Sequence, residues 1–451
     1  IYNAIVVTVT IGSAFAGFGL NLAATRYVAL LRREDENSSW LVAKKIVLLS
    51  VVLTVVVTAI YFAISPLLSI YFTKSTTWTW VFLEGGVWLF STTLSGTLQG
   101  IILGLKKYTL LAKILFVSRL SMVALTVGVL FFYHSVGIAI LAWVVFNMII
   151  LLWILALIGR NLLGTTGTFS YGNILRYVFP LGLAGVIAVF ATSSDTVLVG
   201  GYLNLGSLAV YGAATTISGV LGIVVLTPLT SALLPEISSS GGLGDASYGL
   251  KLAFKFTMLA ILPASLLVAG VSTQLLSLIT GSGYLSGSFT LEMIALFYVF
   301  LAIQNILLVL LQAVGKTRGV IVVGIVTALT DVGLALLLVP QFGLAGAVAS
   351  RVAVYIDGAV VSIFLARTYL KNLDPISYYL KGAIAAGLPF VIVLALSSFV
   401  SARLITLVPY AALYAIVFLL LVKWFRLLGP EDRKLLSQTL PSRLRKFVDF
   451  I

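Results

Sequence analysis

The chain has 451 residues, of which 61% are hydrophobic and 9% are charged, and its formal net charge is +14. A soluble domain carries about 25% charged residues, so this composition excludes a chain that covers itself with a water-facing surface. The absence of cysteine excludes disulfides, thiolate metal sites and thiol nucleophiles, and the single histidine, His134, excludes a histidine-rich metal site.

Long apolar runs dominate the chain. A membrane-spanning helix needs about 20 mostly apolar residues, and thirteen such runs lie between glycine, proline or charged positions. They predict helices near 2–31, 43–72, 78–105, 108–133, 135–159, 173–202, 206–234, 249–279, 289–313, 318–339, 342–367, 379–400 and 403–427. Several connections are so short that consecutive helices must be antiparallel neighbours. We therefore predict an all-α, polytopic transmembrane bundle.

Lysine and arginine indicate the orientation of these helices, because cytoplasmic loops retain them. Of the 28 such residues, 23 fall in one alternate set of connections or in the C-terminal tail, whereas the opposite set holds only Lys74 and Arg403. Three further arginines lie within or at the ends of spans: Arg26, Arg119 and Arg351. This distribution predicts a cytoplasmic C-terminus. Because Ile1 already lies inside an apolar run, we expect one further helix before it, which would make fourteen.

The net positive charge is thus mainly a topology signal. We expect no nucleic-acid partner, because no folded soluble module offers a basic face. The segment 428–451 has Pro430 at a helix start, then acidic and later basic residues. It is predicted to be a cytoplasmic, amphipathic tail on the anionic inner leaflet, with binding to a partner protein as the alternative.

Three short patterns occur twice, in the same order, at offsets of 206 to 213 residues. The pairs are Tyr2-Asn3-Ala4 with Tyr211-Gly212-Ala213, Leu98-Gln99-Gly100 with Leu311-Gln312-Ala313, and Gly137-Ile138-Ala139 with Gly343-Leu344-Ala345. The offsets span an even number of helices, so both copies run the same way, and such lobes enclose a substrate site. We predict an N-terminal lobe of five visible helices over 1–160, a cytoplasmic linker over 161–172, a six-helix C-terminal lobe over 173–367 and an additional helix pair over 379–427.

Several of these segments resemble a known family. They are Gly19-Leu20 with Arg26-Tyr27, Pro180-Leu181-Gly182, Asp195 to Gly200, Tyr211 to Ala214, Leu233 to Ser238, Leu311 to Lys316 and Val339 to Ala347. In this order they are similar to the polysaccharide, O-antigen flippase-like branch of the multidrug/oligosaccharidyl-lipid/polysaccharide exporter superfamily, over nearly the whole chain. The resemblance implies two pseudo-symmetric lobes of six helices plus two extra C-terminal helices.

The resemblance also implies a function. The chain would carry a polyprenyl-phosphate-linked glycan, on undecaprenol or dolichol, from the inner to the outer leaflet of the plasma membrane by alternating access. Its partners would be this substrate, membrane lipids and glycan assembly enzymes.

Three arginines are candidates for binding an anionic headgroup, because ionisable side chains in the bilayer are costly unless they are paired or functional. Arg119 lies near the middle of helix 108–133, where a guanidinium suits a phosphate. Arg26 at the inner end of the first helix could steer the headgroup, or be a plain cytoplasmic flank. Arg351 could line the cavity, or clamp two helices together.

Three aspartates are candidates for ion coupling or gating. By position, Asp331 and Arg351 match in depth on antiparallel helices, so a salt bridge is expected, either as a clamp or as a pair that opens toward the substrate phosphate. Asp357, on another face of the same helix as Arg351, could bind H⁺ or Na⁺ or serve as a buried structural partner. The family resemblance makes Asp195 a third candidate.

No P-loop, H-E-x-x-H or nucleophile-elbow motif is present, so we expect no enzyme activity, no cofactor and no metal. Transport would then use an H⁺ or Na⁺ gradient or the downhill fate of the substrate. The main alternative is an ion-coupled multidrug or cation antiporter of the same fold. A membrane-embedded glycan ligase or glycosyltransferase is disfavoured by the short outer connections, and a structural scaffold leaves the repeat unexplained.

Overall fold

The computed structural model describes residues 1–32, 35–133, 135–163, 171–227, 230, 243–314, 316–370, 373–399 and 406–429. Every regular element in these ranges is a helix. Within these ranges, twelve helices are long and apolar enough to cross a membrane, and a bent pair gives a thirteenth span if it is counted as one. The predicted all-α transmembrane bundle is therefore confirmed. Arg403, residues 164–170 of the predicted linker and the tail after Gly429 lie outside the described residues.

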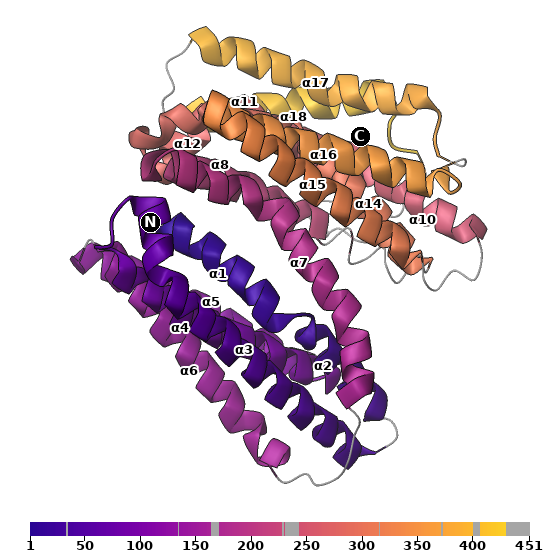
Figure 1. The fold of residues 1–451 in the computed structure, drawn as a ribbon. Helices are drawn as coiled ribbons and strands as arrows, with labels where there is room; N and C mark the ends of the chain where they lie inside the picture. Colours follow the sequence, from indigo (N-terminus) through magenta and orange to yellow (C-terminus); the bar gives the residue numbers. More distant parts are fainter. Residues whose placement is uncertain are drawn as a thin grey trace. The chain divides into compact units, whose positions relative to one another are not determined.

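The contacts divide the chain into unit 1, Ile1–Ala209, and unit 2, Val210–Ile451. The helices of unit 1 are α1 (Tyr2–Gly17), α2 (Leu20–Leu31), α3 (Glu36–Thr73), α4 (Thr79–Gly104), α5 (Tyr108–Tyr133), α6 (Val136–Leu163) and α7 (Tyr171–Tyr202), followed by α8 (Leu205–Leu221), which crosses the boundary (Figure 1). Within unit 1, α4 packs against α1, α2, α3 and α6. It is also the most buried span, so the core of this unit forms around it.

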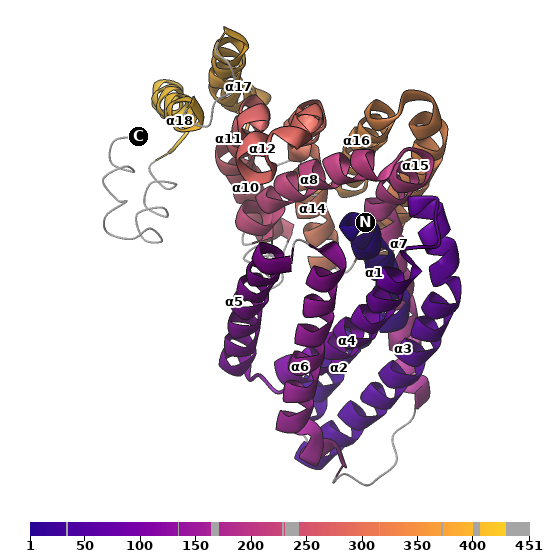
Figure 2. The ribbon, with the colours of Figure 1, turned by 90° about the vertical axis from the view of Figure 1, so that its left-hand side faces the viewer.

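Unit 2 contains shorter helices, which are joined in places by π-helical or 3₁₀ turns. After α8 come a π turn (Gly222–Leu226), α10 (Leu243–Phe256), a second π turn (Thr257–Ile261), α11 (Leu262–Gly270), α12 (Ser272–Thr280), a 3₁₀ turn (Ser282–Gly287), α13 (Ser288–Leu296), α14 (Tyr298–Ala313), α15 (Thr317–Phe342), α16 (Leu344–Ala366), α17 (Ile376–Phe399) and α18 (Leu407–Trp424). Helices α15 and α16 form an extensive antiparallel pair, and α17 packs against α18 and α11 (Figure 2).

Helix α7 belongs to unit 1 by its contacts with α1, α2 and α3. The internal repeat assigned the same helix to the C-terminal lobe over 173–367. The two units are defined by contacts between helices, whereas the predicted lobes are defined by the sequence repeat. The contacts therefore do not test the predicted lobe boundaries, which stay a prediction.

The predicted helix over 2–31 forms one bent span but is not continuous. Phe18 and Gly19 have φ angles of 33° and 75°, and the axes of α1 and α2 differ by 41°. Glycine adopts this left-handed region without the strain that a side chain imposes. Figure 1 shows α1 and α2 as two separate helices with a short connection between them. The predicted helix over 249–279 is likewise divided, at the π turn and at Val271.

Helix α3 begins at Glu36, seven residues before the predicted start, because Asp35 caps it. The Asp35 carboxylate accepts hydrogen bonds from the backbone N–H groups of Asn37 (3.1 Å) and Ser38 (2.8 Å) and from the Ser38 hydroxyl (2.7 Å). These bonds favour the ionised form, so they hold the pKa of Asp35 below its usual value. The bond from the Ser38 hydroxyl has the largest effect. The cap satisfies backbone donors that the first turn of a helix leaves unpaired.

Lys74, an exception to the predicted charge distribution, joins the ends of two helices. Its ammonium donates hydrogen bonds to the carbonyl of Tyr71 at the end of α3 (3.0 Å) and to that of Gly201 at the end of α7 (2.8 Å). A cation at a helix C-terminus is favourable because it neutralises the negative end of the helix dipole. Lys74 therefore has a structural reason to lie on the lysine-poor side.

We expect Lys74→Met to lower the free energy of unfolding by about 1 kcal/mol, because two helix ends lose their cation. Thermal unfolding in detergent measures this as a lower transition temperature. Lys74→Arg should retain most of the stability. Lys107→Met, an exposed cation between α4 and α5, is the control, and an equal loss in both variants would contradict the capping role.

Candidate functional site

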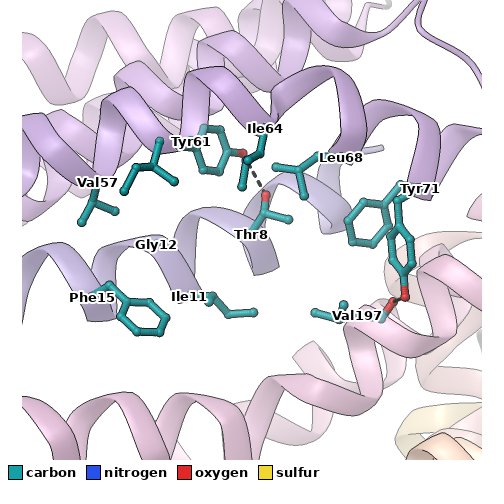
Figure 3. Close-up of a pocket in the computed structure, with 12 residues that line it drawn as sticks. Thr8, Ile11, Gly12, Phe15, Val57, Tyr61, Ile64, Leu68, Tyr71 and Val197 are labelled. Atoms are coloured by element: carbon teal, nitrogen blue, oxygen red, sulfur yellow. Dashed lines mark hydrogen bonds between the residues drawn. The ribbon is translucent and has the colours of Figure 1, made fainter.

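Helices α1, α3 and α7 of unit 1 line a cavity of about 500 Å³ that is open on one side, where Phe15, Ile60 and Ile64 are exposed. This volume falls within the range of about 300–1,000 Å³ that ligand sites occupy. The walls are Thr8, Ile11, Gly12, Phe15, Val57, Ile60, Tyr61, Ile64, Leu68, Tyr71, Phe72 and Val197 (Figure 3). Most of them come from one face of α3, and we call the cavity the apolar slot.

The few polar atoms of the apolar slot are bonded to one another or to the backbone. The hydroxyls of Thr8 and Tyr61 lie 2.9 Å apart, as the dashed line in Figure 3 shows. Thr8 also bonds to the carbonyl of Ala4 at 3.0 Å, and the Tyr71 hydroxyl donates to the carbonyl of Val197 at 3.4 Å. With its hydroxyls satisfied in this way, the slot suits hydrocarbon rather than a polar ligand.

Arg26 lies on α2, and the structure fixes it on an aromatic ring. Its guanidinium carbon is 4.3 Å from the ring centroid of Tyr177 on α7, and the ring of Tyr27 meets the same tyrosine edge-on at 5.6 Å. Six residues earlier on α7, the ring centroid of Tyr171 lies 4.7 Å from the ammonium of Lys45. Cation–π attraction therefore holds two cations beside the first turns of α7, while Arg26 stays exposed.

Arg119 is exposed on α5 and shares a helical face with Phe116, Leu120 and Val123, which are also exposed. Ser118, which the sequence places beside it, is buried on the opposite side. Helix α4 packs against both α2 and α5, so the structure does not bring Arg119 to Arg26 as one site. The predicted role of Arg119 in binding phosphate stays a prediction.

The three other candidates in unit 2 lie on the packed pair α15 and α16. Asp331 is fully buried and Arg351 is 8% exposed. The hydroxyl of Thr330, next to Asp331, donates to the Asp357 carboxylate at 2.6 Å. Asp357 therefore also faces α15. The structure brings Asp331, Arg351 and Asp357 to one helix pair, while their roles and the expected salt bridge stay predictions.

Asp195 lies in α7 of unit 1 and is fully buried. Its carboxylate accepts hydrogen bonds from the backbone N–H of Thr196 (2.6 Å) and from its hydroxyl (3.2 Å). Within the part of the chain that the structure describes, no group of three or more His, Cys, Asp or Glu residues could hold a metal ion. None of these contacts tests a role of Asp195 in ion coupling, so that role stays a prediction.

Sequence reasoning missed the apolar slot and the aromatic supports of Arg26. The spacing of Val57, Tyr61, Ile64, Leu68 and Tyr71 on α3 repeats every three to four residues. This spacing is typical of any packed helix face, so nothing in it distinguishes a slot from a core. The partner walls on α1 and α7 are far away in the sequence.

A family model described as polysaccharide biosynthesis protein matches residues 1–240. Among solved structures, the lipid II flippase MurJ in an inward closed conformation has a TM-score of 0.75 at 13% identity, over 94% of this chain and 97% of that one. An inward-facing multidrug resistance MATE family transporter of the MOP superfamily has a TM-score of 0.67 at 17% identity, over 81% of this chain and 89% of that one.

A MOP superfamily transporter from Pyrococcus furiosus has a TM-score of 0.58 at 19% identity, over 82% of this chain and 87% of that one. No curated protein sequence matches the chain. At these identities the structural similarity establishes the fold alone. The fold is one that flippases and multidrug transporters share.

Proposed function

Because the chain belongs to the polysaccharide biosynthesis protein family, we propose that it flips a lipid-linked oligosaccharide from the inner to the outer leaflet for the synthesis of a cell-surface polysaccharide. The resemblance inferred from the sequence is confirmed for the family and for the transporter fold. The proposal adds the substrate, a glycan on a polyprenyl (pyro)phosphate. It also adds alternating access and a plasma-membrane location with a cytoplasmic C-terminus.

The exposed guanidinium of Arg26, 4.3 Å above Tyr177, carries this proposal. A guanidinium offers paired N–H donors that match two phosphate oxygens. The tyrosine ring fixes its position without neutralising its charge. A fixed cation at this point attracts the anionic headgroup of a lipid-linked sugar and repels a cationic drug.

The other candidates then have distinct roles in the proposed cycle. Arg351 binds the phosphate during transport, and Asp331 competes with the substrate for it. Asp357 and Asp195 bind the coupling H⁺ or Na⁺. The burial of Arg351, Asp331 and Asp195 supports their assignments, because charges within the membrane-spanning helices are costly unless they are compensated or functional.

A cation antiporter is the second candidate, since multidrug transporters share the fold and Asp195 and Asp331 are buried carboxyl groups. Reconstitution into vesicles separates the two functions. We expect transbilayer movement of a fluorescent lipid-pyrophosphate-sugar and no proton-driven efflux of a cationic dye. Dye efflux without lipid movement would reverse this ranking.

We expect Arg26→Ala to slow flipping about tenfold or more, because a charge-assisted hydrogen bond contributes about 1.5–3 kcal/mol. Arg26→Lys should retain the charge but lose the paired geometry, so its flipping rate should lie between those of the natural chain and Arg26→Ala. The initial flipping rate in vesicles is the measurement. Arg160→Ala, an exposed arginine in the last turn of α6, is the control, and equal rates in all four proteins would remove Arg26 from the site.

A further inference from the structure

The apolar slot is elongated. Its wall on α3 runs from Val57 to Phe72, which at 1.5 Å per residue is about 22 Å. The opposite wall is formed by Thr8 to Phe15 of α1, with Val197 of α7 near one end. A long apolar cavity with satisfied hydroxyls fits an extended hydrocarbon chain better than a compact ligand.

Lys74 provides a cation near one end of the slot, the end that Tyr71 and Phe72 line. The ammonium of Lys74 is 5.7 Å from the centroid of the Tyr71 ring. It donates to the carbonyls of Tyr71 and Gly201, which uses two of its three hydrogens. Because the residue is exposed, the third hydrogen and the positive charge can reach a ligand. The slot and Lys74 together are amphipathic: apolar along about 22 Å and positive at one end.

We propose that the slot and Lys74 form a site for polyprenyl phosphate, with the isoprenoid chain between α1 and α3 and the phosphate at Lys74. The inference rests on the proposed function, which supplies an isoprenoid-linked substrate. The aromatic walls Phe15, Tyr61 and Tyr71 offer flat surfaces to its methyl branches. Charge complementarity at Lys74 selects an anionic lipid.

The predicted topology assigns a step in transport to this site. Lys74 lies on the lysine-poor side, which the charge distribution predicts to be the outer one, whereas Arg26 lies at the opposite end of the bent α1–α2 span. The site therefore holds the lipid carrier after flipping, or the emptied carrier phosphate, and Arg26 meets the substrate before flipping.

A cysteine-protection experiment tests the site, because the natural chain has no cysteine. Leu68→Cys places a thiol in the slot, and a membrane-permeant maleimide measures its accessibility. We expect polyprenyl phosphate at ten times its Kd to slow labelling about tenfold, since about one site in eleven stays empty. Val127→Cys, on the exposed face of α5, should label at the same rate with and without lipid.

Two further lipids distinguish the source of protection. Polyprenol has the same chain without the charge, and phosphatidylglycerol has a similar charge on acyl chains. Both should protect Leu68→Cys at least several-fold less at equal concentration. Lys74→Met should reduce protection by polyprenyl phosphate to the level of polyprenol, and Lys74→Arg should restore it. Equal protection by phosphatidylglycerol would show a bulk-lipid site, and protection by no lipid would show that the slot holds no lipid; either result overturns the proposal.

Filling the slot gives an independent test. Ile64→Trp should abolish protection, whereas Leu67→Trp, an exposed neighbour on α3 that does not line the slot, should preserve it. Full protection in Ile64→Trp would overturn the site. If the natural chain fails to flip lipid-linked sugar but shows selective protection, the proposed function fails and the polyprenyl phosphate site stands.

Discussion

Replacing Arg351 with alanine is expected to abolish movement of a lipid-linked oligosaccharide, whereas lysine at this position should retain part of it. Arg351 is 8% exposed on α16 and packs in the α15–α16 pair that also buries Asp331. Two lost charge-assisted hydrogen bonds to phosphate amount to about 3–6 kcal/mol, so the rate should fall by about a hundredfold or more. Lysine keeps the charge and loses the bidentate geometry.

A helix clamp predicts a different result for the same variants. Removing one member of a buried charge pair costs about 3–5 kcal/mol of stability, but the folded molecules would still flip lipid at the normal rate. Flipping per folded protein, with the fold checked by size-exclusion chromatography and thermal unfolding, separates the two. Arg367→Ala, at the exposed end of the same helix, is the control. Unchanged flipping in Arg351→Ala would remove Arg351 from the substrate path.

Gly100→Ala is expected to destabilise unit 1 by about 3 kcal/mol, the upper part of the usual range for an overpacked core. A Cβ atom at Gly100 would lie 2.3 Å from the backbone carbonyl oxygen of Asn21, and a backbone cannot turn aside as a flexible side chain can. The same contact brings the Thr25 hydroxyl to the Gly100 carbonyl at 3.1 Å. Both the apolar contact of α2 with α4 and this bond would be lost.

Gly96, one turn earlier on α4, is a matched control because a Cβ atom there meets nothing within 4 Å. Gly96→Ala should leave the melting temperature unchanged or raise it, since alanine is the better helix former by about 1 kcal/mol. The two variants therefore differ in sign. Equal melting temperatures in detergent for Gly100→Ala and the natural chain would contradict the close approach of α2 and α4.

The number, order and approximate ranges of the helices could be predicted because apolar run length is a direct consequence of membrane thickness. The ends and breaks could not. Asp35 with Ser38 three residues later is a capping signal that apolar runs hide. The break at Phe18 and Gly19 lies within a single apolar run, since the segments on both sides are apolar on average, so the length of the run does not reveal it.

The site was less predictable than the fold. Sequence reasoning paired Asp331 with Arg351 by depth on neighbouring antiparallel helices, and the structure places both residues, with Asp357, on the packed pair α15 and α16. The sequence alone could not show that Arg26 lies over the ring of Tyr177, because that contact joins α2 to α7 across 151 positions of the chain. Lys74 was counted as an exception to a statistical rule, although its hydrogen bonds give it a specific role.

The interrupted backbone between α1 and α2 restricts how this part of the molecule can deform. Gly19 lies against the backbone of Gly182 and the side chain of Leu181 on α7, at 3.1 Å from a Cβ position, and Phe18 meets Phe179 at 6.0 Å. Non-helical backbone at membrane depth is tolerated only where protein covers it or water reaches it. Moving α7 away into lipid would expose this backbone, so we expect α1, α2 and α7 to stay in contact wherever lipid surrounds them.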